Sequence, residues 1–222
     1  FGRLLKNTFL ISGLTILFGF PAPIILALMI NEVKNSAFKR TVQTITYMPY
    51  FISMVVLCGL LKTFCMQDGL FAQIAVLFGG KAQNYLANPA YFRTIYVLSD
   101  IWSGIGWNSI IYLAALSSID QEQYEAARVD GANRFEQMIH ITLPGLVPTI
   151  MVLFILRMGN ILNVGYEKIL LLYNSATYST ADVISTYTYR LSFGGSGNPM
   201  YSKSTAIGLF NTIIKVFFLM LT

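Results

Sequence analysis

The amino-acid sequence predicts an all-α membrane protein that crosses the bilayer several times. Charged residues make up 11% of the 222 positions, whereas soluble domains carry about 25%. Hydrophobic residues make up 55%, and the mean hydropathy is +0.60. With 15 basic and 10 acidic side chains, the chain cannot surround a water-soluble globule with charge. Apolar residues are too plentiful for disorder, so an integral membrane protein is the class that remains.

Five stretches are long and apolar enough to be transmembrane helices of a single domain over residues 1–222. They cover residues 9–30, 41–61, 94–119, 145–166 and 204–222. The first two carry no charge. Pro21 and Pro23 predict a kink in the first, which neighbouring helices can tolerate, and the second contains Pro49. The other three contain one charge each, at Asp100, Arg157 and Lys215.

The segments between these stretches differ in length and polarity. Residues 70–78 are apolar but too few to span a bilayer, so we expect an interfacial helix there. Residues 167–203 form the longest connection, and their Gly194–Gly197 run predicts a turn. The distribution of basic residues between the links weakly favours a cytoplasmic position for residues 31–40 and 120–143.

The segment 120–144 is unusually polar and predicts two short helices. Asp120 is placed to cap the first, and Gly131 can end it because glycine adopts the left-handed conformation at little cost. Asn133 and Glu136 have the spacing of a capping box for the second. Pro144 then falls in the first turn of the fourth predicted span, where proline is best tolerated.

A motif with seven fixed positions runs through this segment. It reads Glu125-Ala126-Ala127, three residues, Gly131, nine residues, and then Ile141-Thr142-Leu143-Pro144. This pattern resembles the EAA loop of permease subunits in ATP-binding-cassette (ABC) importers, and a chance match over so many positions is rare. The flanks resemble the sugar-importer branch, whose oligosaccharide and polysaccharide permeases are relatives of the maltose permease. These flanks are residues 110–116, 124–132 and 204–211.

The resemblance implies a type-I importer core with six helices, of which this sequence shows five, with a further N-terminal span and a longer last one expected. It implies a bacterial inner or plasma membrane location and half of a saccharide translocation path. The implied partners are a second permease subunit, cytoplasmic ABC ATPase subunits that hold ATP and magnesium, and an extracytoplasmic solute-binding protein. The chain itself would bind no cofactor and hydrolyse nothing, since it lacks a phosphate-binding loop.

The chemistry of the loop agrees with a role in transmitting force to the spans. Ala126 and Ala127 allow a partner to approach closely, and Glu125 offers an anionic anchor. Gly131 permits a sharp turn, so that the first helix can protrude. The residues expected to carry the coupling are Glu125, Ala126, Ala127, Asp130, Gly131, Ile141, Leu143 and Pro144.

Charges and amides inside the spans are the candidates for the solute path, because intramembrane charges usually face the protein interior or a water-filled route. Asp100 and Arg157 lie at similar depth if adjacent helices run antiparallel, and we expect them to pair. The alternative is that they fix helix packing alone. Arg157, Asn160 and Asn163 share one helix face by their spacing. Weaker candidates on the third span are Asn108 and Tyr112.

Other functional classes find less support. His140 is the only histidine and has no second ligand nearby, so neither a metal site nor a catalytic group is predicted. Basic residues are scattered, which argues against nucleic acid. An ion-coupled secondary transporter would show inverted repeats and more acidic residues at mid-membrane. A non-sugar cargo for the same kind of importer stays open, as do the length and charge of the glycan.

Overall fold

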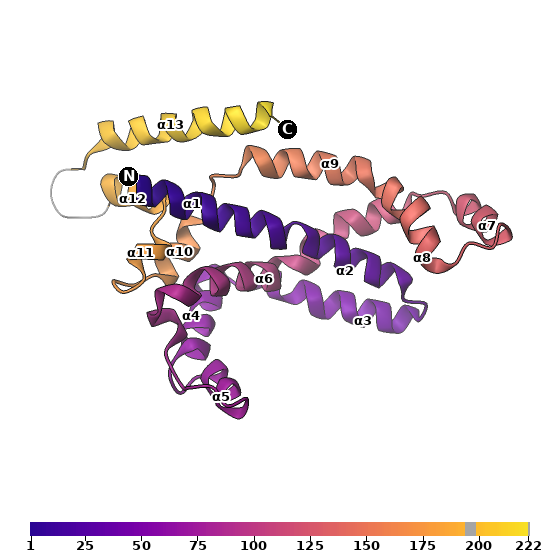
Figure 1. Cartoon of the computed structure of the whole chain (residues 1–222), viewed down its shortest axis with the longest axis horizontal. Coiled ribbons are helices and arrows are strands. Elements are labelled where there is room, and N and C mark those ends of the chain that lie inside the picture. The colour runs from indigo at the N-terminus through magenta and orange to yellow at the C-terminus, as the bar shows by residue number, and fades with distance from the viewer. Residues whose placement is uncertain (194–198, 222) are drawn as a thin grey trace.

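The computed structural model describes residues 1–193 and 199–221, and every regular element in these ranges is a helix (Figure 1). The predicted all-α class is therefore confirmed. The predicted turn at Gly194–Gly197 lies outside the described residues. The α-helices are α1 (Gly2–Leu14), α2 (Pro21–Glu32), α3 (Ser36–Tyr47), α4 (Met54–Cys65), α5 (Leu70–Leu77), α6 (Pro89–Ser117), α7 (Gln121–Val129), α8 (Arg134–Gln137), α9 (Leu143–Gly159), α10 (Tyr166–Leu172), α11 (Tyr178–Ala181), α12 (Ile184–Phe193) and α13 (Tyr201–Met220).

Four helical stretches among the described residues could cross a membrane by length and composition. They are Gly2–Glu32, Met54–Leu77, Arg134–Gly159 and Tyr201–Met220. The predicted span over 94–119 corresponds to α6, which is not among these four but has 29 residues. At about 1.5 Å per residue, it is long enough to cross. It packs against α2, α3 and α9, so that neighbouring helices can shelter its polar side chains from lipid.

The first predicted span lies within one long rod formed by α1 and α2 (Figure 1). Between them, residues Thr15–Gly19 form a π-helical turn, termed η1. Pro21 begins α2 directly after this turn. Because proline has no N–H to donate, the wider turn before it accommodates the backbone without ending the rod.

The prediction of one continuous helix over 41–61 is wrong. The helix α3 ends at Tyr47, a 3₁₀ turn termed η2 (Met48–Phe51) follows, and α4 starts at Met54 in a different direction (Figure 1). Pro49 lies in the turn, where its missing N–H costs no helical hydrogen bond. The Ser53 side chain then accepts from the Val56 N–H and caps α4. A helix does form near the predicted 70–78, as α5. It lies within the candidate span Met54–Leu77, so its interfacial position stays a prediction.

The fourth predicted span, 145–166, also ends earlier than expected. The helix α9 stops at Gly159, and residues 160–165 form a turn before α10. The Asn160 N–H bonds to the Arg157 carbonyl, and the Asn163 N–H bonds to the Asn160 carbonyl. These tighter bonds satisfy backbone groups at the helix end. Asn160 and Asn163 therefore lie beyond the helix, and the predicted shared helix face is wrong.

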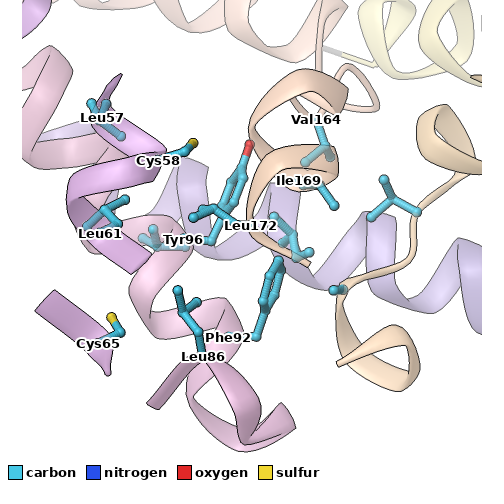
Figure 2. Packing of buried hydrophobic residues seen from close by; sticks show 14 residues of the cluster. Leu57, Cys58, Leu61, Cys65, Leu86, Phe92, Tyr96, Val164, Ile169 and Leu172 are labelled. Carbon is cyan, nitrogen blue, oxygen red and sulfur yellow. The ribbon is translucent and has the colours of Figure 1, made fainter. Parts of the chain in front are cut away.

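Two apolar clusters hold the bundle together. The larger joins α4, α6 and α10 through residues such as Leu57, Phe92 and Ile169 (Figure 2). The smaller joins α2, α6 and α9 around Tyr112 and Leu146. Helix α6 contributes to both clusters, so it is the central element. The polar helices α7 and α8 lie at one end of the molecule, and α10, α11 and α12 lie at the other (Figure 1).

Candidate functional site

Capping hydrogen bonds between nearby residues start and end the helices α7 and α8, which lie at one end of the molecule. The Asp120 carboxylate accepts from the Glu122 N–H at 3.0 Å and starts α7. Gly131 follows α7 with a φ of +83°, the left-handed conformation expected of it. Asn133 and Glu136 form a full capping box, with N–H to side-chain oxygen distances of 2.7 and 3.0 Å. The two predicted short helices are thus confirmed. A second π-helical turn, η4 (Met138–Thr142), leads into α9.

The loop exposes a surface of small and acidic side chains to solvent. Glu125, Ala126, Asp130 and Gly131 are exposed, and Ala127 is half-buried. No described residue forms a hydrogen bond or ion pair with the Glu125 carboxylate, so it is available to a partner. Two apolar side chains beside this surface escaped the sequence analysis. Val129 is 88% exposed and Phe135 is 65% exposed.

Side-chain hydrogen bonds fasten α7 to the base of α9. The Tyr124 hydroxyl and the Thr142 hydroxyl are 3.0 Å apart, and Thr142 is buried. The Gln137 amide donates to the Ala132 carbonyl at 2.8 Å and closes the turn around Gly131. The motif residues at the end of the loop lie in the same region, with Ile141 and Leu143 half-buried and Pro144 in the first turn of α9.

An ion pair links the loop to the first rod. The Arg134 guanidinium lies 3.3 Å from the Glu32 carboxylate at the end of α2. Both side chains are about half exposed, and exposed ion pairs add little stability. The contact therefore places the loop against α2 more than it strengthens the fold.

A polar cavity lies at the far end of α9. It has a volume of about 360 Å³ and is bounded by α1, η1, α6, the end of α9 and the start of α10. A smaller cavity of about 180 Å³ adjoins it and shares Asp100 and Arg157. The six predicted path residues all line one or both of these cavities. Asp100, Arg157, Asn160 and Asn163 line the larger, and Asp100, Arg157, Asn108 and Tyr112 line the smaller.

The expected ion pair between Asp100 and Arg157 is not formed. The Asp100 carboxylate instead lies 3.4 Å from the Lys168 ammonium, on α10. Lys168 is 2% exposed, donates to the Tyr96 carbonyl at 3.1 Å, and lies over the Tyr96 ring at 4.6 Å. The turn after Gly159 explains the difference. It brings α10 back against α6, so that Lys168 reaches Asp100 from a segment that the sequence analysis placed in an outer loop.

Lys168 is therefore a site residue that the sequence reasoning missed. One signal was available, because Lys168 directly precedes the apolar run Ile169–Leu172. A lysine next to such a run can be buried if a carboxylate and carbonyl receive its protons. Which carboxylate does so depends on the turn at 160–165, and no local pattern predicts that turn.

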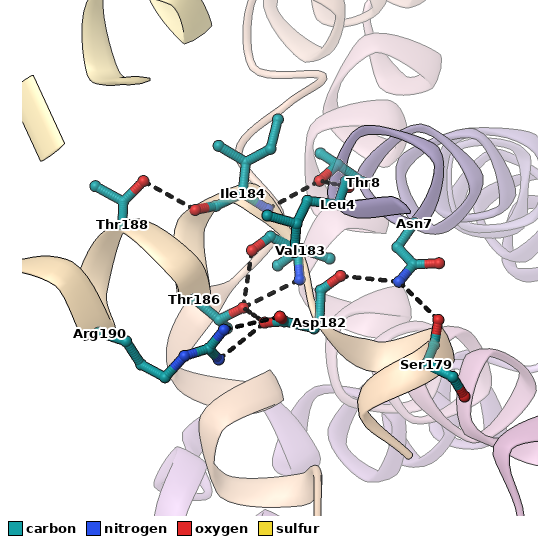
Figure 3. A network of polar contacts seen from close by, with 10 residues as sticks. All are labelled: Leu4, Asn7, Thr8, Ser179, Asp182, Val183, Ile184, Thr186, Thr188 and Arg190. Atoms are coloured by element: carbon teal, nitrogen blue, oxygen red, sulfur yellow. Dashed lines mark hydrogen bonds and ion pairs between the residues drawn. The ribbon is translucent and has the colours of Figure 1, made fainter. Parts of the chain in front are cut away.

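A second polar network fixes the outer segment to α1 (Figure 3). Arg190 forms two hydrogen bonds to Asp182, at 2.9 and 2.8 Å, and the Thr186 hydroxyl donates to the same carboxylate. This bonding to Asp182 raises the pKa of Arg190. On α1, the Asn7 amide donates to the Asp182 carbonyl, and the Thr8 hydroxyl accepts from the Ile184 N–H. The network holds the end of α11 and the start of α12 against α1.

The described ranges contain no group of three His, Cys, Asp or Glu side chains that could hold a metal ion. His140, the single histidine, contacts the Glu136 carbonyl through Nδ1 at 2.9 Å. The two cavities carry the amides, hydroxyls and charges that bind polar solutes, and the loop carries a surface suited to a partner protein.

Comparison with known proteins places the chain in one family. The model of the family described as "binding-protein-dependent transport system inner membrane component" matches residues 19–222. Protein LplB of Bacillus subtilis (strain 168) is 43% identical over 217 residues, which cover 97% of this chain and 67% of LplB. The polygalacturonan/rhamnogalacturonan transport system permease protein YteP of the same strain is 42% identical over 222 residues, covering 100% of this chain and 68% of YteP.

The fold is similar to a solved structure as well. A chain from the crystal structure of a bacterial ABC transporter involved in the import of the acidic polysaccharide alginate superposes with a TM-score of 0.95 and 48% identity. The match covers 100% of this chain and 77% of the other.

Proposed function

The chain belongs to the family of binding-protein-dependent transport system inner membrane components, and on that premise we propose that it forms half of a translocation path for an oligo- or polysaccharide. It is a multi-pass membrane protein and a transport subunit. The names of the relatives support the cargo class, since YteP is named for polygalacturonan and rhamnogalacturonan, and the similar structure is of a transporter involved in alginate import. The energy would come from ATP hydrolysis on separate subunits, which would hold the ATP and magnesium.

The chemistry of the larger cavity suits a saccharide. Sugars present many hydroxyl groups, and amides can both donate to and accept from them. Asn160 and Asn163 supply such amides at the cavity wall. Tyr96 and Tyr166 line the same space, and aromatic side chains offer an apolar body with a polar tip. A solute rich in hydroxyl groups is thus favoured over an apolar one.

The observation that carries the coupling proposal is the course of α9. Its base at Leu143 follows directly from the loop, and Arg157 in its last turn lines both cavities. The helix has 17 residues, about 25 Å at the usual rise per residue. Pro148 lies inside it and removes one backbone hydrogen bond, but the helix continues past this point. A displacement of the loop would therefore move part of the cavity wall.

This connection gives a route for alternating access. Closure of the ATPase subunits would displace α7, and the Tyr124–Thr142 contact would carry that displacement into α9. Movement of α9 relative to α6 would then change the cavities that these two helices share. Glu125 and the small Ala126 would form the contact with the ATPase, with Val129 and Phe135 as apolar neighbours.

Two further partners complete the proposed assembly. A second permease subunit would close the cavities, because Arg157, Asn160 and Asn163 are exposed in this chain alone. A solute-binding protein would dock on the outer segment 167–203, whose described part is held to α1 by the Asp182 network. The family description itself names dependence on a binding protein.

Reconstitution of the complete transporter tests the proposal. Proteoliposomes would hold ATP inside, with the binding protein and a labelled oligosaccharide outside. We expect ATP-dependent accumulation of the sugar by the wild type. In Glu125→Gln we expect the rate of uptake to fall at least about tenfold, because one charged hydrogen bond at the interface with the ATPase is lost. Glu122→Gln, on the same exposed helix, is the matched control and should retain uptake.

The outcomes separate the parts of the proposal. If wild-type vesicles loaded with ATP accumulate no saccharide, the cargo class is wrong. If Glu125→Gln transports as fast as wild type, the loop does not couple through this carboxylate. Quantifying each variant in the membrane excludes failed insertion as the cause of a loss.

A further inference from the structure

Among the described residues that line the candidate solute path, Arg157 is the cation without an ion-pair partner. Four charged side chains line the larger cavity, namely Asp100, Arg157, Glu167 and Lys168. Asp100 and Lys168 pair with one another at 3.4 Å. Glu167 is exposed and accepts a hydrogen bond from the hydroxyl of its neighbour Tyr166. No described residue forms an ion pair or side-chain hydrogen bond with the Arg157 guanidinium.

Arg157 also occupies the junction of the path. It lines the larger cavity and the adjoining smaller one, so a solute that passes between them passes this side chain. In the smaller cavity the charged lining residues are Asp100 and Arg157. Because Lys168 already neutralises Asp100, the smaller cavity presents one net positive charge, that of Arg157.

An unmatched guanidinium inside a membrane protein calls for an anionic partner. Charges at membrane depth are costly and face partners or water-filled routes. A guanidinium matches a carboxylate in shape and can form two parallel hydrogen bonds with it. Uronic acids are sugars that carry such carboxylates, and their hydroxyl groups would suit Asn160 and Asn163 beside Arg157.

We propose that Arg157 binds the carboxylates of a uronic-acid oligosaccharide as it passes between the two cavities, and so selects anionic cargo. This inference rests on the proposed function. The Asp100–Lys168 pair has a positioning role in it. By keeping the Asp100 carboxylate on Lys168, the pair leaves the Arg157 guanidinium free for the cargo. Had Asp100 paired with Arg157, the unpaired cation would be Lys168, which is buried and does not line the smaller cavity.

The test compares cargo with and without carboxylates. Pentasaccharides of galacturonate and alginate and their carboxyl-reduced counterparts are supplied to the complete transporter in proteoliposomes, with its binding protein in excess. Each cargo is compared with itself across the variants, so the preference of the binding protein cancels. We expect Arg157→Gln to lower uptake of an acidic pentasaccharide at least about tenfold, as for loss of a charged hydrogen-bond pair, and to leave uptake of the reduced form unchanged.

Two further variants separate charge from structure. Arg157→Lys keeps the positive charge and should retain most uptake of the acidic cargo. Lys81→Gln is the control, because it removes an exposed positive charge that lines neither cavity, and it should not lower uptake of the acidic cargo. If wild type does not transport the reduced forms, the contrast between Arg157→Lys and Arg157→Gln on acidic cargo decides the question.

Several results would overturn the inference. Equal losses for Arg157→Gln on acidic and reduced cargo would mean that the role of Arg157 does not depend on the carboxylates of the cargo. Equal losses in Arg157→Lys and Arg157→Gln would exclude a role for its charge. Uptake of reduced forms only would exclude anionic selection while leaving saccharide transport intact. If wild type transports none of these sugars, the proposed function fails, and the inference fails with it.

Discussion

The partner of Asp100 illustrates what spacing along a chain can and cannot predict. Counting residues from the predicted span boundaries placed Asp100 and Arg157 at similar depth, and both do line the same two cavities. The choice of ion-pair partner depends on a contact between segments 68 positions apart, Asp100 and Lys168. Depth follows from local sequence, whereas pairing follows from the path of the backbone after α9.

We predict that Asp100→Ala destabilises the protein and that Arg157→Ala does not. Lys168 is 2% exposed, and a buried ammonium that loses its carboxylate pays for desolvation without compensation. Since Asp100 is 39% exposed, the cost should be moderate, about 1–2 kcal/mol. Thermal unfolding of the purified complex in detergent measures the difference as a lower Tm for Asp100→Ala.

Arg157→Ala is the matched control, because it removes a charge from the same cavity that has no partner among the described residues. Equal Tm values for Asp100→Ala and wild type would show that the Lys168 contact does not stabilise the fold. An equal drop in both variants would indicate that Arg157 also has a structural partner in the assembled transporter.

Among the helices, the end signals in the polar segment 120–144 were recognised, whereas the breaks inside apolar stretches were missed, even where Pro49 and Ser53 marked one of them. The caps at Asp120 and Asn133 and the turn at Gly131 follow from single residues whose chemistry ends or starts a helix. The breaks at 48–53 and 160–165 fall inside long apolar stretches. Hydropathy reports only that such a stretch is buried or faces lipid, and it does not distinguish a helix that continues from one that turns.

The hydrogen bond between Tyr124 and Thr142 should transmit movement from α7 to α9. Tyr124→Phe keeps the ring and removes only the hydroxyl that lies 3.0 Å from Thr142. We expect assembly to stay normal while transport per ATP hydrolysed falls several-fold, since a loosely fastened helix moves without moving its neighbour. Simultaneous assays of sugar uptake and ATP hydrolysis in proteoliposomes give this ratio.

A double-mutant cycle isolates the contact. Thr142→Val removes the other hydroxyl, and if the bond itself matters, the double variant should be no worse than the more affected single variant. Additive losses would assign separate roles to the two residues. A ratio of transport to hydrolysis equal to that of wild type in Tyr124→Phe would exclude the bond from the coupling route.

The candidate path as a whole is made by segments that are far apart in the sequence. Its walls come from α1, η1, α6, the end of α9 and the start of α10. The motif predicted the loop because its signal is contiguous, while the cavity required the complete fold. In the folded chain one side of the larger cavity is open, since Arg157, Asn160 and Asn163 remain exposed on the chain alone. A bilayer cannot solvate such a surface, which supports the proposed second permease subunit.

This exposed polar surface leads to a prediction about assembly. Expressed without a second permease subunit, the chain should accumulate poorly or aggregate in the membrane, because lipid would contact its charged and amide side chains. Co-expression with that subunit should restore a monodisperse complex, and native mass spectrometry should find two permease chains, identical or different. Cysteines introduced at Asn160 and Asn163 should react with a water-soluble maleimide in the assembled complex, since the cavities are then closed against lipid but open to water. A single permease chain that is stable and monodisperse in lipid nanodiscs, with these positions unreactive, would show that the cavity residues face lipid and that this surface is no part of a shared path.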